Sequence, residues 1–154
     1  MLITAQNFID SGIRVSSDIS DSEINMAITT VEQFYLKNRI GDTNYADLNT
    51  NPATATNYIL LNGGTIDNNV FAGLKLALYH LVYAYLLTDT MRITRYSTME
   101  KNSEFSKNSE REDILEQARV HWNVGMSFVG EVEKYYGLDN TRNNTNNLFE
   151  SVLF

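Results

Sequence analysis

Val70 to Leu87 read VFAGLKLALYHLVYAYLL, and the rest of the fold can be argued from this stretch. Only Lys75 and His80 interrupt its apolar run, so a helix here would be apolar on nearly every side. Such a helix must be covered on most sides by other elements. We therefore expect an all-α fold, a compact bundle of about four to five helices around one apolar central helix.

This stretch is also long enough to reach the lower limit for a membrane-spanning helix. The charge of Lys75, the imidazole of His80 and the interspersed tyrosines make a span unfavourable. Acidic, amphipathic segments flank the stretch on both sides. The sequence therefore favours a core helix and no membrane association.

Length and charge restrict the classes of function. The 154 residues suffice for one domain with a sizeable core. The formal net charge of -7 argues against a surface that grips DNA phosphates, but it suits one that nucleic acid slides past. The absence of cysteine excludes disulfides and thiolate metal sites. The first residues lack the basic flank and the long apolar run of a signal peptide.

Upstream of the central helix, the sequence predicts a short helix over residues 4–11 and a longer one over 21–39. Ser20 and Glu23 have the spacing of a capping box, which satisfies the free amides at a helix start. Gly41 is a typical residue for ending the longer helix. Its apolar stripe at helical spacing consists of Ile24, Ala27, Ile28, Val31, Phe34 and Tyr35.

A polar connection and a short helix should follow. Residues 42–50 are interpreted as the connection. Asn51 and Pro52 resemble an N-cap followed by proline at the first helical position, so a short helix should run from there to Leu61. The connection carries two apolar anchors, Tyr45 and Leu48.

The central helix should begin after a break at Gly63 and Gly64, with Asp67 as its N-cap, and should end near Met91. Residues 92–108 sustain neither the helical nor the strand period. We therefore expect an extended arm there, which becomes ordered in an assembly.

The last helix should run over residues 110–136, opened by a second capping box of Ser109 and Glu112. Gly125 and Gly130 inside it indicate the close approach of a partner helix. Its apolar stripe consists of Ile114, Ala118, Trp122, Gly125, Val129, Val132 and Tyr136. Its packing on the central helix should bury Leu78, Leu81 and Trp122.

Residues 1–137 thus form one helical domain, and residues 138–154 form a flexible C-terminal tail. The Asn-rich part of the tail cannot bury enough apolar surface to fold alone. The tail ends in an apolar hook that needs a receiving surface on a neighbour, on a partner or on its own domain. The hook consists of Leu148, Phe149, Val152, Leu153 and Phe154.

No pattern typical of a catalytic, cofactor or metal site occurs. His80 and His121 fall on different helices without ligand spacing, so we interpret them as ordinary core or surface histidines. Phosphate-binding loops and nucleophile elbows are absent from the sequence. The acidic clusters around Glu112 and Glu131 are interpreted as solvated helix faces and partners of the helix dipole.

Two other classes of function compete with a structural role. A stand-alone helical module could bind a small molecule in a pocket lined by Tyr79, His80, Tyr83 and Trp122. An unrecognised enzyme could use the glutamates together with His121. A ligand-dependent melting temperature would favour the first, and loss of an activity without loss of folding on mutating His121 would favour the second.

Several segments, taken in order, carry a resemblance to a known class of proteins. The chain resembles the small helical head–tail connector proteins (adaptor or neck-ring proteins) of tailed bacteriophages. The nearest version is found in phages and prophages of Bacteroidetes-type hosts, including crAss-like phages. The resemblance covers Ser20 to Gly137, and its segments are YILLNGGTI (58–66), FAGLKLALYHLVYAYLL (71–87), TRYSTMEKNSEFS (94–106) and EKYYG (133–137).

The resemblance implies a structural virion protein in the phage neck, assembled in the host cytoplasm, with no enzymatic activity and no cofactor or metal. It implies a homo-oligomeric ring, usually a dodecamer, between the portal protein and the next tail or neck ring protein. DNA would be ejected through the channel of the ring without specific binding. Candidate assembly contacts are Arg92, Ile93, Arg95, Tyr96, Met99, Lys101, Phe105, Leu148, Phe149, Val152, Leu153 and Phe154.

Overall fold

In the computed structural model, the backbone is described for residues 1–13, 19–98 and 104–138, and the side chains for the same residues outside 89–111. The described chain is mostly helical with one small two-stranded sheet, which confirms the expected all-α fold. The elements in chain order are α1 (Ala5–Asp10), α2 (Asp21–Val31), the π-helical turn η1 (Glu32–Leu36), α3 (Lys37–Ile40), α4 (Asp42–Thr50), α5 (Ala55–Asn62), β1 (Gly64–Ile66), β2 (Asn69–Phe71), α6 (Leu74–Thr98) and α7 (Glu104–Tyr135).

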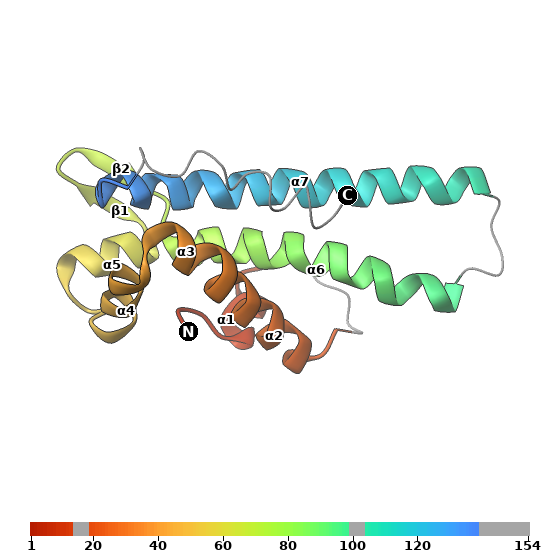
Figure 1. Ribbon diagram of the computed structural model, residues 1–154, viewed down its shortest axis with the longest axis horizontal. Coiled ribbons are helices and arrows are strands. Elements are labelled where there is room, and N and C mark those ends of the chain that lie inside the picture. The colour runs from red at the N-terminus through yellow and green to blue at the C-terminus, as the bar shows by residue number, and fades with distance from the viewer. Residues whose placement is uncertain (14–18, 99–103, 139–154) are drawn as a thin grey trace.

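The long helices α6 and α7 form an antiparallel pair that runs the length of the molecule (Figure 1). Helices α1 to α3 lie along one side of this pair, and α4, α5 and the hairpin gather at one end of it. As expected, Leu78, Leu81 and Trp122 are buried in this arrangement. Among the described helices, none has the length and the apolar character needed to cross a membrane.

The two glycines of α7 behave differently. A Cβ atom at Gly125 would lie 2.6 Å from Cγ of Leu81 and 2.9 Å from the carbonyl oxygen of Ala77. The predicted close approach of a partner helix is therefore confirmed at Gly125. At Gly130 a Cβ atom would meet nothing within 4 Å, so the same prediction is wrong there.

Helix α2 begins at the predicted capping box, in which the amide of Ser20 donates to Glu23 Oε2 at 2.8 Å and the amide of Glu23 donates to Ser20 Oγ at 3.3 Å. The helix continues through η1 and α3 as an unbroken run. A π-helical turn contains about one residue more than an α-helical turn. The residues after it therefore face the core one position later than they would in a regular α-helix. Leu36 and Ile40 are buried as a result, whereas Phe34 is 67% exposed, and its place in the predicted stripe is wrong.

The segment after α3 is more helical than expected. The predicted polar connection is helix α4, although both of its anchors, Tyr45 and Leu48, are buried as expected. Helix α5 begins at Ala55 and not at Pro52, because the hydroxyl of Thr54 caps it by accepting from the amide of Asn57 at 3.3 Å. The N-cap assigned to Asn51 is therefore wrong.

The hairpin of β1 and β2 was not predicted. Its strands are antiparallel, with Thr65 opposite Val70. Asp67 and Asn68 form the two-residue turn with φ of +47° and +66°, the left-handed geometry that such tight hairpins use. Asp67 is therefore a turn residue and not the N-cap of the central helix, which begins at Leu74.

The chain leaves the hairpin through a close crossing over the end of α5. Gly73 has φ of +94°, and a Cβ atom there would lie 2.5 Å from the amide nitrogen of Gly63 and 2.9 Å from the carbonyl oxygen of Leu61. Any side chain at residue 73 would collide with backbone atoms. The GGTI and FAGL segments thus fix where α6 starts relative to α5.

The expected extended arm over residues 92–108 is wrong wherever the chain is described. Helix α6 continues through Thr98, and α7 begins at Glu104. The second capping box, Ser109 and Glu112, therefore lies inside α7 and not at its start. This end of the helical pair projects beyond α1 to α5 (Figure 1). It therefore does not need the broad apolar stripe that identifies the other helices in the sequence.

Candidate functional site

A contact between two histidines joins the long helices. The Nδ1 atom of His80 on α6 lies 2.8 Å from the Nδ1 atom of His121 on α7. In a neutral pair, one ring donates its Nδ1–H to the unprotonated Nδ1 of the other. From the sequence the two residues were expected to be ordinary core or surface histidines on different helices, but the structure brings them into contact.

Aromatic rings hold the pair in place. The ring of Tyr83 lies 4.6 Å from that of His121 with an edge-on tilt, and the ring of Phe128 lies 6.1 Å from that of His80. Burial lowers the pKa of His121 below its ordinary value. Burial, and then the neighbouring His121, lowers the pKa of His80 as well. Both rings are therefore neutral at physiological pH.

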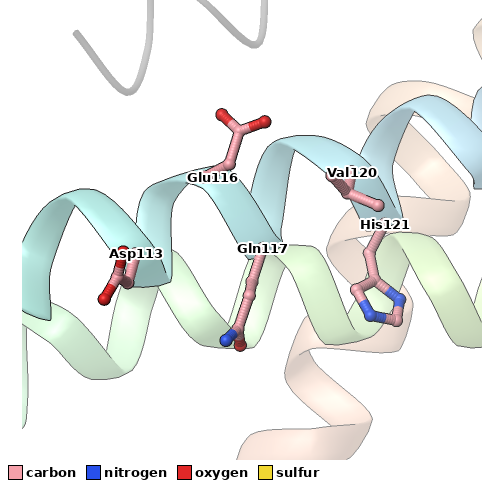
Figure 2. Close-up of a pocket in the computed structure, with 5 residues that line it drawn as sticks. All are labelled: Asp113, Glu116, Gln117, Val120 and His121. Carbon is pink, nitrogen blue, oxygen red and sulfur yellow. The ribbon is translucent and has the colours of Figure 1, made fainter.

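A shallow depression on α7 adjoins the histidine pair. It is lined by Asp113, Glu116, Gln117, Val120 and His121. Figure 2 shows that Gln117 and His121 point toward the neighbouring α6, whereas the carboxylate of Glu116 points away from it. Among the residues whose side chains are described, no group of three or more histidine or acidic side chains is arranged to hold a metal ion. The histidine pair therefore has acidic side chains nearby on α7.

A family model, described as a family of unknown function (DUF6712), matches residues 36–145. This match spans most of the chain. The chain belongs to the DUF6712 family. The matched part contains His80 and His121 and both long helices. No curated protein and no solved structure matches the chain.

In this DUF6712 protein, two glutamates of the last helix are engaged in structural contacts. Glu133 is nearly buried and pairs with Arg39 of α3 through both oxygens, which lie 2.5 Å from Nε and 2.6 Å from an Nη. Glu131 Oε2 accepts a hydrogen bond from the amide of Ala72 at 2.9 Å. These contacts join α7 to α3 and to the end of β2.

Glu32 is a buried carboxylate that was not predicted from the sequence, with 1% of its surface exposed. Its Oε1 accepts from the amides of Leu2 and Ile3 at 2.7 and 3.4 Å, and its Oε2 accepts from the hydroxyl of Tyr45 at 2.6 Å. Burial, followed by the hydrogen bond to Glu32, raises the pKa of Tyr45, so its hydroxyl stays protonated as the donor. Glu32 thus ties the N-terminal segment to η1 and α4.

The four residues considered for the pocket of a stand-alone binding module make several different ring contacts. Tyr79 contacts Phe8 of α1 with ring centroids 6.3 Å apart, and Trp122 contacts Tyr35 of η1 at 4.8 Å. His80 and Tyr83 instead contact His121. The four predicted pocket residues therefore serve three separate contacts, and none of them lines the depression on α7.

The candidate assembly contacts lie outside the part of the chain whose side chains are described. The backbone of α6 and α7 includes Arg92, Ile93, Arg95, Tyr96 and Phe105, and the remaining candidates lie outside the described residues: Met99, Lys101, Leu148, Phe149, Val152, Leu153 and Phe154. Their role in assembly stays a prediction.

The sequence held a weak signal for the histidine pair. His80 and His121 each precede by one residue a side chain expected at the α6–α7 interface, namely Leu81 and Trp122. Both histidines were therefore expected near the interface of the two helices, whereas the contact between their rings depends on the register of the pair. For Arg39 and Glu133 the sequence held no signal, because their contact depends on how α3 crosses α7.

Proposed function

We propose that the protein is a structural component of the neck of a tailed bacteriophage. It forms a homo-oligomeric ring between the portal protein and the next tail or neck ring protein, and the ring extends the channel for DNA. The observation that carries this proposal is the resemblance over Ser20 to Gly137. The protein acts as a scaffold and not as an enzyme.

The shape of the chain supports this proposal. One end of the α6–α7 pair projects beyond α1 to α5, so in a ring neighbouring subunits could pack against it (Figure 1). Each subunit of a ring contacts one neighbour through one surface and its other neighbour through a second surface. A projecting helical pair can supply such contacts. The net charge of -7 further suits a channel through which DNA slides without being held.

Exposed apolar residues on α2 and η1 offer a surface for contacts between subunits. Met26 is 63% exposed and Phe34 is 67% exposed. They lie on the same continuous helical run, and the π-helical turn is what leaves Phe34 in solvent. In a ring, this surface contacts a second copy of the chain.

The experiment that tests the proposal is electron microscopy of the purified full-length chain, alone and mixed with its portal protein. Ring-shaped particles, or a ring seated on the portal, are the expected result. A chain that stays monomeric in both conditions contradicts it. Mass photometry at several protein concentrations gives the subunit number independently.

A truncation tests the role of the tail within the same proposal. Residues 140–154 are proposed to dock as a strap on a neighbouring subunit or on the portal. Burying the apolar side chains of the hook contributes roughly 1.5–3 kcal/mol each when fully covered, less the cost of ordering the linker. Deleting residues 140–154 should leave the melting temperature nearly unchanged and weaken ring formation or portal docking. Unfolding of the truncated chain, or undiminished assembly, contradicts the strap.

A further inference from the structure

We propose that His80 and His121 form a pH-sensitive contact, which holds α6 to α7 at neutral pH and is lost when both rings carry a charge. The rings face each other through their Nδ1 atoms, which lie 2.8 Å apart, and the ring centroids are 5.0 Å apart. A hydrogen bond in this arrangement needs a proton on one Nδ1 and a lone pair on the other. The contact therefore depends on how many protons the two rings hold together.

The first proton taken up from solvent preserves this hydrogen bond. In the neutral pair, the donating ring has an unprotonated Nε2, and a proton bound there leaves the bond between the two Nδ1 atoms in place. The second proton has to occupy the accepting Nδ1. Two Nδ1–H groups then face each other, so the hydrogen bond is lost and two imidazolium charges repel each other at close range.

The immediate surroundings of the rings are apolar and aromatic, which makes a second charge costly. Tyr83 and Phe128 contact the rings edge-on. No residue within four positions of His80 in the sequence is charged. Helix α2 packs on α6, and its buried side chains are all apolar. Burial, and for His80 also the neighbouring His121, lowers the pKa of each histidine.

The charged groups of α7 near the pair offer little compensation. Asp113 and Glu116 line the depression beside His121. Glu116 points away from α6 and accepts a hydrogen bond from Arg119 at 2.8 Å (Figure 2). Asp113 precedes His121 by two helical turns, which separates their backbones by about 12 Å along the helix axis. Neither carboxylate therefore forms an ion pair with a charged His121 in this arrangement.

Charged groups on α6 and on the smaller elements that pack around it have hydrogen-bond partners of their own. Such pairs are Asp10 with Gln6 on α1, Glu23 with Ser20 at the start of α2, and Lys75 of α6 with Asn62 of α5. Asp21 lies beside Glu23 in the first turn of α2. The pair of histidines is therefore the group whose protonation changes the contact between the long helices.

Loss of this contact should lower the stability of the fold in mild acid. In the unfolded chain each histidine binds a proton near pH 6.5, whereas the folded pair resists the second proton. As the pH falls through 6.5, the unfolded state therefore takes up more protons than the folded state and is favoured. Between pH 7.5 and 5.5, the equilibrium constant for unfolding should rise about tenfold for each proton that the folded pair excludes.

Urea denaturation of the full-length chain at pH 7.5, 6.5 and 5.5 tests the proposal. The variant to compare is the double substitution His80→Phe and His121→Phe, which keeps two aromatic rings. The sequence has only these two histidines, so the double variant contains no imidazole and should lack the tenfold rise. Tyr83→Phe is the matched control, because it keeps the ring beside His121 and should retain the rise.

A second measurement follows the imidazole ¹⁵N resonances of the unmodified chain over the same pH range, and it decides the matter if the double variant does not fold. Both rings should respond together to the first proton, and the second proton should bind at a clearly lower pH. Two independent titrations near pH 6.5 would overturn the proposal. An equal pH dependence in the unmodified chain and the double variant would overturn it too. Neither measurement requires ring formation.

Discussion

At the scale of single residues, an absent side chain sets the distance between the long helices. Gly125 allows α7 to approach Leu81 and the backbone of Ala77, where a Cβ atom would be too close to both. Leu81 itself is fully buried, so it cannot move into solvent to make room. The same helix contains Gly130, which has open space around its Cα atom.

Gly125→Ala should therefore destabilise the protein by about 1–3 kcal/mol, the usual cost of forcing extra atoms into a packed core. Gly130→Ala is the matched control, and it should stabilise α7 by roughly 0.5–1 kcal/mol because alanine favours helix over glycine. Urea denaturation of both variants measures the free energies of unfolding. Equal effects of the two substitutions would show that α6 does not press on Gly125.

A second residue-scale effect is the pH dependence of the cap on α2. The hydrogen bonds from the side chain and then the backbone of Ser20 lower the pKa of Glu23. A carboxyl with a lowered pKa in the folded state stabilises that state above its unfolded pKa, which is about 4.3. This contribution is lost as the pH falls through the pKa of the folded state.

Glu23→Gln should therefore destabilise the protein at pH 7, and its difference from the unmodified chain should shrink as the pH falls below about 4.3. Denaturation in urea at a series of pH values from neutral to acidic measures this. Asp21→Asn removes a charge from the same first turn without changing the capping box. It therefore measures how much of the effect comes from losing a negative charge near the positive end of the helix dipole. A difference that is independent of pH would contradict the assignment.

At the scale of elements, Glu32 connects three parts of the chain that are far apart in sequence. It lies on η1, accepts the hydroxyl of Tyr45 from α4 and accepts two amides that precede α1. A buried carboxylate needs all of these donors, since an unpaired one would be costly. The N-terminal segment and α4 are therefore positioned by one side chain.

Tyr45→Phe should destabilise the protein by about 1–3 kcal/mol, because it leaves one oxygen of a buried carboxylate without its donor. Tyr58→Phe makes the same chemical change at a side chain that is 58% exposed, and it should have almost no effect. Thermal and urea denaturation of both variants provide the comparison. A small effect of Tyr45→Phe would mean that water replaces the phenol.

The elements that could be predicted from sequence are those set by local or strongly periodic signals. The capping box of Ser20 and Glu23 acts within one turn, and the run around Leu78 and Leu81 is apolar on nearly every side. Elements set by contacts across the fold could not be predicted. The Asp67 turn depends on the pairing of two three-residue strands, too short to show a period.

The same distinction holds for the candidate site. His80 and His121 carry no spacing signal, because their contact exists only once α6 and α7 are paired in this register. The helical continuation over residues 92–98 was missed for a related reason. A helix that packs mainly on one partner needs few apolar residues, so its pattern resembles that of a loop.

At the scale of the whole molecule, the proposed ring depends on surfaces that the isolated chain leaves in solvent. Phe34 is a large aromatic side chain that is 67% exposed, and its burial against a neighbour would stabilise the ring. The residue before it, Gln33, is also exposed on the same turn. Substitutions at Phe34 and at Gln33 can therefore be compared, to distinguish the loss of an apolar contact from a general change of this surface.

Phe34→Ser should weaken ring formation at least tenfold in protein concentration while leaving the melting temperature of the monomer nearly unchanged. Gln33→Ser should assemble as the unmodified chain does. Mass photometry over a dilution series measures the concentration at which rings dissociate. Rings of unchanged stability in Phe34→Ser would exclude this surface from the subunit interface without excluding the ring itself.

The π-helical turn η1 also bears on how the length of this chain can vary among relatives. Such a turn holds one residue more than the α-helix around it requires. A relative lacking one residue in this turn could form a regular α-helix, in which the positions of Val31, Leu36 and Ile40 fall on one stripe with normal spacing. In comparisons of family members, single-residue gaps within this helix should therefore concentrate at η1. Such relatives would also lack the outward turn that exposes Phe34.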